Sequence, residues 1–232
     1  MGGKLLKPKE RYRVGLQLLG PVEGKKVVDA GCGFGTLEQF IEAVGVDLHV
    51  ANLGRTKEKM PGHDFVAASL GKIPLPDNFF DAAICLETLE HVQEERKSLS
   101  EIQRILKPGG RLVLSVPNCR LLYNFIDLEH WLVPLLTKRA IHRHYAKKIL
   151  GNMLAEAGFE VERTLERGML ITACIRWFYL PFDLLDYCFF GGLNGPLGRF
   201  LRKMFDWLVD LEFQIPTFFG GTLFVVAHKR NI

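Results

Sequence analysis

The stretch that decides the fold runs Lys26-Val27-Val28-Asp29-Ala30-Gly31-Cys32-Gly33-Phe34-Gly35-Thr36. An apolar run ends at an acid, and three glycines follow at alternate positions before a helix-like segment. Glycine permits a tight strand-to-helix turn and lets a ligand approach the backbone closely. Amide groups at the start of a following helix would also favour a negatively charged ligand group. The stretch therefore predicts a ligand-binding loop after a buried strand, with an ordinary glycine-rich turn as the alternative.

The glycine spacing bears on which ligand the loop can hold. Gly31, Gly33 and Gly35 form GxGxG, and position 36 is threonine. The chain therefore lacks the GxGxxG spacing of loops that cradle a dinucleotide pyrophosphate.

Length and composition indicate one folded domain. With 232 residues the chain can bury one substantial core. Its hydrophobic content of 48% and charged content of 24% are those of an ordinary folded protein. The net charge of +4 is mild, so charge alone does not imply a nucleic-acid partner.

The cysteines favour a reducing compartment. The chain has five of them, far apart and without a CxxC pair: Cys32, Cys85, Cys119, Cys174 and Cys188. This pattern is typical of reduced thiols in a cytoplasmic protein and argues against a disulfide framework or a zinc site. The most apolar region, residues 168–193, is broken by charges and a proline, so a spanning helix is not expected. Peripheral contact with the inner membrane surface stays open.

Apolar runs and helical periodicities alternate along the chain. The predicted strands are residues 26–29, 45–48, 64–68, 80–86, 111–116, 159–164 and 222–228. The predicted helices are residues 11–19, 36–43, 99–106 and 146–157. Such alternation predicts an α/β protein with a doubly wound, mostly parallel sheet.

Motifs spread along the chain resemble the class I S-adenosylmethionine-dependent methyltransferases. Asp29 with the GxGxG loop resembles their motif I, and residues 73–81 resemble the loop that enters their fourth strand. Residues 86–92 are similar to the segment after that strand, and residues 101–110 to the helix and turn before the fifth. The resemblance implies a Rossmann-like fold with one antiparallel strand, a single methyltransferase domain over residues 1–232, and S-adenosyl-L-methionine as cofactor.

The resemblance also implies a set of cofactor-binding residues. Asp29 and the glycine loop would line the methionine end, and Asp47 would accept hydrogen bonds from both ribose hydroxyls. Where the family often has an acid near the adenine, this chain has Ser69, which can accept a hydrogen bond only without charge. The full set expected to bind the cofactor is Asp29, Gly31, Cys32, Gly33, Gly35, Asp47, Leu48, Ser69, Leu70 and Leu86.

Two segments exceed what a minimal sheet needs. Residues 118–145 are expected to form a lid, and residues 166–221 an apolar insertion and helical cap before the last strand. Both should leave from and return to the carboxyl edge of the sheet, where ligands of open α/β sheets bind. Exposed apolar surface of this kind is typical of a partner, a membrane surface or a lipophilic ligand. The basic run from Lys138 to Lys148 is either a solvated face or a site for an anionic head group.

Methyl transfer is an in-line displacement, so the protein must align donor and acceptor and remove a proton where needed. His91 is the expected base because its ordinary pKa lies near working pH, and Glu87 is a second catalytic candidate. Glu87, Glu90 and His91 form ExxEH, which resembles the metal motif of polyprenyl-quinone O-methyltransferases and small-RNA 3′-terminal 2′-O-methyltransferases. A divalent ion there, with His144 as a fourth ligand, could activate a hydroxyl. We favour the alternative of no metal.

These observations predict methyl transfer from S-adenosylmethionine to a lipophilic or lipid-linked small molecule. Oxygen is the acceptor atom that we favour. An RNA 2′-O-methyltransferase is the enzymatic alternative, but the extra sequence is apolar rather than a basic and aromatic groove, so nucleic acid is disfavoured. A non-catalytic protein that binds the cofactor and docks on a membrane or partner is the other alternative.

Overall fold

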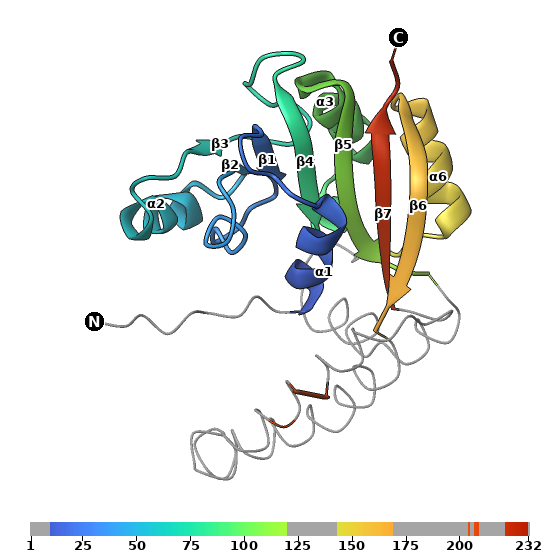
Figure 1. Cartoon of the computed structure of the whole chain (residues 1–232), viewed down its shortest axis with the longest axis horizontal. Coiled ribbons are helices and arrows are strands. Elements are labelled where there is room, and N and C mark those ends of the chain that lie inside the picture. Colours follow the sequence, from blue (N-terminus) through green and yellow to red (C-terminus); the bar gives the residue numbers. More distant parts are fainter. Residues whose placement is uncertain (1–9, 120–142, 169–203, 205–206, 209–220, 232) are drawn as a thin grey trace.

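The computed structural model describes residues 10–119, 143–168, 204, 207–208 and 221–231 (Figure 1). Most of the predicted lid and of the apolar insertion lie outside the described residues, as does the basic run before Arg143. The expectations for a helical cap therefore stay predictions.

In the described part of the chain, seven strands form one sheet in the order β3-β2-β1-β4-β5-β7-β6. They are β1 (Val27–Ala30), β2 (Val44–Asp47), β3 (Phe65–Ala67), β4 (Phe80–Leu86), β5 (Leu106–Pro117), β6 (Phe159–Arg167) and β7 (Thr222–Lys229). Strand β7 runs antiparallel to both its neighbours, and the other pairs are parallel. This confirms the predicted sheet. The carboxyl ends of β5 and β6 share one edge, the lower one in Figure 1.

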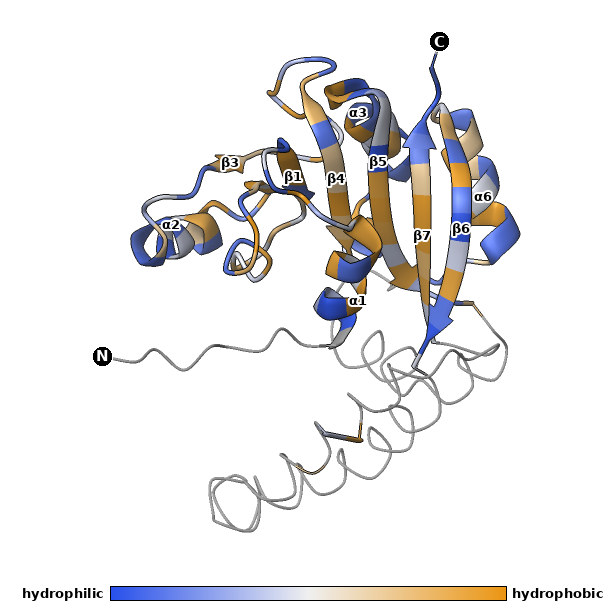
Figure 2. Ribbon diagram, viewed as in Figure 1, coloured by the Kyte–Doolittle hydropathy of each residue, from blue (hydrophilic) through white to orange (hydrophobic). Residues whose placement is uncertain are grey.

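Helices cover both faces of the sheet. Helix α1 (Glu10–Leu19) packs on one face, and α3 (Glu95–Ile105) and α6 (Lys147–Glu156) pack on the other. Side chains of β5 alternate between the two cores, because successive residues of a strand point to opposite faces. The apolar colouring of the central strands in Figure 2 follows from this burial on both sides. Helix α2 (Val50–Lys59) follows β2, and a short 3-10 turn, η1 (Leu89–His91), follows β4.

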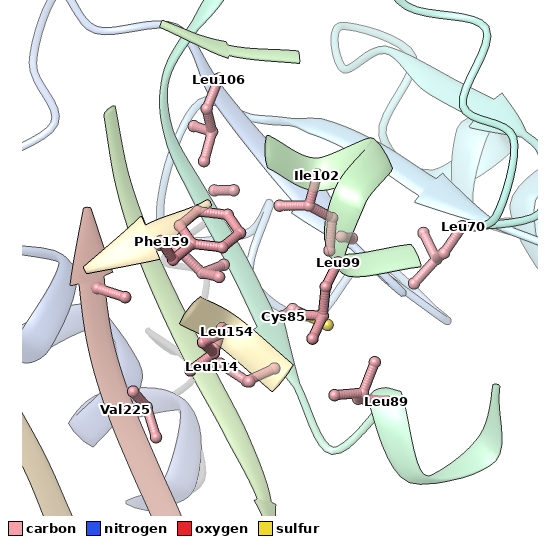
Figure 3. Packing of buried hydrophobic residues seen from close by; sticks show 14 of the residues in the cluster. Leu70, Cys85, Leu89, Leu99, Ile102, Leu106, Leu114, Leu154, Phe159 and Val225 are labelled. Atoms are coloured by element: carbon pink, nitrogen blue, oxygen red, sulfur yellow. The ribbon is translucent and has the colours of Figure 1, made fainter. Parts of the chain in front are cut away.

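The larger core lies between the sheet and the pair α3 and α6. Leu99 and Ile102 of α3 pack toward Leu114 of β5 and Phe159 of β6, and all four are fully buried (Figure 3). Burying a side chain of this size stabilises the fold by roughly 1.5–3 kcal/mol. This core therefore fixes the strands whose carboxyl ends carry the candidate site.

The predicted helix over residues 36–43 is wrong: these residues form turns. The connection from β1 to β2 covers only residues 31–43, and the glycine loop occupies the first five. A helix over the remaining eight would rise about 12 Å and leave no residues to turn back into β2. Turns closed by bonds from Phe40 N and Ile41 N to Leu37 O replace it. A hollow of about 830 Å³, lined in part by Phe40 and Ile41, lies beside them at the amino edge of the strands.

The first glycine of the loop is required because the loop backbone packs closely against Thr88. Gly31 has a φ of +94°, and a Cβ at this position would overlap the Thr88 side chain, just after β4. The Thr88 hydroxyl in turn donates to the Leu86 carbonyl, at 3.0 Å. The loop after β1 can therefore pack against the end of β4 only with glycine at this position.

We expect Gly31→Ala to destabilise the fold by ~3 kcal/mol or more, since it adds steric overlap to an unfavourable backbone conformation. Gly24→Ala is the matched control, because Gly24 also has a positive φ, +71°, but nothing lies near its Cβ position. It should lose only about 1 kcal/mol. Urea denaturation measures both, and equal losses would show that the contact with Thr88 does not matter.

Candidate cofactor and acceptor site

The glycine loop is held against the end of β2 by backbone hydrogen bonds. Gly31 N and Cys32 N both donate to the Val46 carbonyl, at 2.7 and 3.1 Å. Gly33 N donates to Oδ2 of Asp47 at 2.9 Å. The loop after β1 and the acid at the end of β2 therefore form one unit, as the predicted cofactor site requires.

Asp47 faces both the loop and its own following turn. Its Oδ1 accepts a hydrogen bond from His49 N at 2.8 Å, and His49 Nδ1 lies 3.1 Å from the same oxygen. The side chain is 12% exposed, so the carboxylate sits at a surface and is not sealed in the core. The hydroxyls of a bound ribose would compete for this carboxylate with the hydrogen bonds that it now accepts from Gly33 N and His49 N.

Behind this surface lies a group of buried acids. Asp29 is buried in β1, and burial, followed by the charges of Glu38 and Asp47, raises the pKa of its carboxyl well above the ordinary range. Glu38 is also buried, and burial raises its pKa to about 7. Neither Glu38 oxygen is hydrogen-bonded to another residue. Three carboxyl groups therefore share the region behind the glycine loop.

Sequence reasoning missed Glu38. It falls in the stretch predicted as helix, between Leu37 and Gln39, and nothing in its spacing marks it as buried. In the structure a Cβ on Gly45 would lie 2.7 Å from Glu38 Oε1, so the absent side chain of Gly45 makes room for this carboxyl.

The remaining predicted cofactor residues lie around this centre. Phe34 lies in the glycine loop and Leu48 directly follows β2. Their side chains are 64% and 65% exposed, so both apolar groups are accessible to a ligand. Nothing lies near the Cβ position of Gly33, so the backbone there is open to a ligand. Exposed Ser69 accepts a hydrogen bond from Gly71 N at 3.2 Å, whereas Leu70 is buried.

The other members of the predicted set are buried. The buried residues are Cys32, Gly35 and Leu86. Burial raises the pKa of the Cys32 thiol, so it stays protonated and acts as a small apolar group. Cys32, Cys85 and Cys119 are free thiols, as expected for a reduced protein.

Glu87 directly follows β4 and contacts residues of β5 and α1. Its backbone has a φ of +50°, and its Oε1 accepts a hydrogen bond from the Ser115 hydroxyl at 2.8 Å. Its other oxygen lies 3.9 Å from Arg11 of α1. Glu87 therefore links the ends of β4, β5 and α1 at the carboxyl edge.

The other two residues of ExxEH differ sharply in exposure. Glu90 is 1% exposed, neither of its oxygens has a hydrogen-bond partner, and burial followed by the Glu87 charge raises its pKa to about 9. Glu90 is therefore protonated at neutral pH. His91 is exposed, with its Nε2 3.9 Å from Glu90 Oε1. Burial of its ring lowers the His91 pKa, with Glu87 opposing, so the imidazole is neutral and can accept a proton.

Across the described ranges, no group of three or more His, Cys, Asp or Glu side chains is arranged to hold a metal ion. The predicted ligands Glu87, Glu90, His91 and His144 therefore do not form a ready cluster there. The described residues give the metal hypothesis no geometric support.

Comparisons with known proteins identify the family. Residues 28–114 match the family described as methyltransferase domain. The chain is 30% identical over 179 residues to the ubiquinone/menaquinone biosynthesis C-methyltransferase of Pseudomonas aeruginosa, covering 64% of this chain and 70% of the relative. It is 37% identical over 132 residues to the demethylmenaquinone methyltransferase of Paenarthrobacter aurescens, covering 55% and 47%. The chain belongs to the class I S-adenosylmethionine-dependent methyltransferase family, whose members are enzymes that use this cofactor.

Solved structures agree on the fold. One is a methyltransferase in complex with the Haloferax volcanii Trm112 methyltransferase activator, with a TM-score of 0.66, 18% identity, and coverage of 97% of this chain and 90% of that one. The chain spans about half the length of several of its curated relatives. Within the described segments, no helix is long and apolar enough to cross a bilayer.

The protonated state of Glu90 gives a pH test. Its folded pKa of about 9 lies above its unfolded value, so the unfolded chain loses this proton first as pH rises. The fold therefore loses stability from about pH 4.5 upward until pH passes about 9. The side chain in Glu90→Gln cannot ionise, so this variant should not lose that stability. Its free energy of unfolding minus that of the parent should therefore be larger at pH 8 than at pH 5 by more than ~1 kcal/mol.

Urea denaturation at a series of pH values measures this difference. Exposed Glu94→Gln is the control, and its difference from the parent should stay constant with pH. If the Glu90→Gln and parent curves run parallel, Glu90 is ionised in the folded protein.

Proposed function

We propose that this protein transfers a methyl group from S-adenosylmethionine to a lipophilic small molecule that carries an ionisable hydroxyl on a conjugated ring. The observation that carries the proposal is the group of acids at the ends of β1 and β2, Asp29, Glu38 and Asp47, beside an open glycine loop. The cofactor carries a sulfonium and an ammonium group, and such cations favour the ionised form of nearby carboxyl groups and are stabilised by it.

Each acid has its own role in this proposal. Asp47 accepts hydrogen bonds from the ribose hydroxyls, and Asp29 supports the methionine end. Ser69 and Leu70 lie toward the adenine, where serine accepts without charge. When bound, the cofactor supplies an electrophilic methyl group, and the protein orients it toward the carboxyl ends of β4 and β5.

His91 is the proposed base. It follows β4 at the carboxyl edge, it is exposed, and its lowered pKa keeps it neutral at working pH. Taking the proton from a ring hydroxyl makes a phenolate, which is nucleophilic at oxygen and at the neighbouring ring carbon. One base therefore serves either acceptor atom. Oxygen remains the sequence-based prediction, whereas the Pseudomonas relative is named a C-methyltransferase.

The lipophilic character of the acceptor has two supports. The insertion before β7 is rich in aromatic residues in the sequence, and two relatives bear the names of quinone-pathway methyltransferases. A roof over the acceptor, and contact of the cap with a membrane surface, are parts of the proposal that fall on residues outside the described ranges.

Turnover with a panel of hydroquinones tests the proposed function. Parent protein, S-adenosylmethionine with a radiolabelled methyl group, and acceptors of increasing side-chain length should give labelled lipid product. His91→Ala should lower kcat by about 10²–10⁴-fold, since it removes the base. His63→Ala is the control, because His63 lines the hollow at the opposite edge. Unchanged turnover in His91→Ala would reject this base, and a parent that labels no acceptor of the panel would contradict the proposed acceptor class.

A further inference from the structure

Arg167, the half-buried last residue of β6, carries two guanidinium nitrogens that have no hydrogen-bond partner among the residues that the structure describes. Its Nε and Nη1 atoms are buried, and neither has a hydrogen-bond partner. Arginine stays charged in proteins, although burial lowers the pKa of this group. A buried charge without a counter-charge is strongly unfavourable, so such groups are normally paired. The free protein therefore holds a cation that a suitable anion would stabilise.

The register of the sheet places Arg167 at the carboxyl edge. It pairs with Thr222 at the start of β7, and Thr222 pairs with Pro117 at the end of β5. Neighbouring strands lie about 4.8 Å apart, so Arg167 is two strands, or about 10 Å, from the end of β5. It therefore lies along the same edge as the predicted acceptor position.

Alternation along β6 decides which charges face Arg167. Leu165 packs with the core under α1, so Arg167, two residues later, lies on the same face of the sheet. Glu166 lies between them in sequence and on the opposite face. On the α1 face, Glu87 is the acid at the end of β4, and it is already held by Ser115 and Arg11. No neighbouring acid of β6 or β4 therefore neutralises Arg167.

We propose that Arg167 binds an anionic group, a carboxylate or a phosphate, on the acceptor molecule. The inference rests on the proposed function and narrows its substrate class to lipophilic acids. A guanidinium binds either group through two parallel hydrogen bonds, which satisfies the donors that are now unpaired. Because Arg167 is two strands from the end of β5, the anion lies on the order of 10 Å along the sheet edge from that strand end.

The first test is thermal stability with and without inorganic phosphate. Phosphate should raise the melting temperature of the parent above the effect of sodium chloride at equal ionic strength. It should have no such effect on Arg167→Gln, whose ligand-free form should be at least as stable as the parent because an unpaired charge is gone. Exposed Arg163→Gln, on the same strand and face, is the control. Loss of stability in Arg167→Gln, with an unchanged phosphate effect, would show that Arg167 is a structural residue and overturn the inference.

The second test compares dodecanoate, dodecyl phosphate and dodecanol, titrated calorimetrically below their micelle concentrations. At least one acid should bind roughly ten- to hundredfold more tightly than the alcohol, and the better acid identifies the anion. Arg167→Gln should lose this preference, and Arg167→Lys should keep part of it. Equal binding of all three, no binding of any, or a preference that persists in Arg167→Gln would overturn the inference.

S-adenosylmethionine is titrated into the same samples. Cofactor binding without a preference for the acids contradicts this inference alone. A parent protein that does not bind S-adenosylmethionine contradicts the proposed function as well.

Discussion

The hydrogen bond from Gly33 N to Asp47 is the contact on which the site depends. In a doubly wound fold a helix usually follows the glycine loop and fixes it against the sheet. Here the connection after the loop has only turns. The end of β2 takes over that task, through the Val46 carbonyl and the Asp47 carboxylate. The same carboxylate is the group expected to hold the ribose, so loop position and cofactor affinity are coupled.

The buried acids behind the loop have a consequence for the catalytic cycle. Burial raises the pKa values of Asp29 and Glu38, and the charges of Glu38 and Asp47 raise that of Asp29 further. A cationic ligand relieves that repulsion, whereas a neutral one does not. The sulfonium becomes a neutral thioether when the methyl group leaves. If these acids bind the cofactor as proposed, the site should hold the donor more tightly than the spent cofactor, which favours product release.

The sequence predicted most of the sheet and the proximity of the glycine loop to Asp47. The run 80–86 matches β4 because an apolar stretch buried on both faces gives a clear signal. The glycine loop, Asp29 and Asp47 come together because both acids end apolar runs on adjacent parallel strands. The relative positions of these candidate residues were thus predictable because strand ends determine them.

The remaining features of the fold and the site could not be predicted from the local sequence pattern. Residues 36–43 favour a helix locally, but the short connection to β2 leaves no room for one. Helix α2 was not predicted, because Gly54 and only a few apolar side chains weaken its periodicity. Glu38 and Arg167 are charged residues whose burial depends on how the chain packs around them, so their positions become apparent only in three dimensions.

Calorimetric titration of S-adenosylmethionine into the parent, Asp47→Ala and Asp64→Ala is the most direct test of the central claim. Asp64 is the matched control, since its side chain is 84% exposed beside Lys57. The account predicts that the parent and Asp64→Ala bind alike, and that Asp47→Ala loses ~2–4 kcal/mol of binding free energy with the charge-assisted ribose hydrogen bonds. Equal affinity in all three proteins, or no binding by the parent, would contradict it.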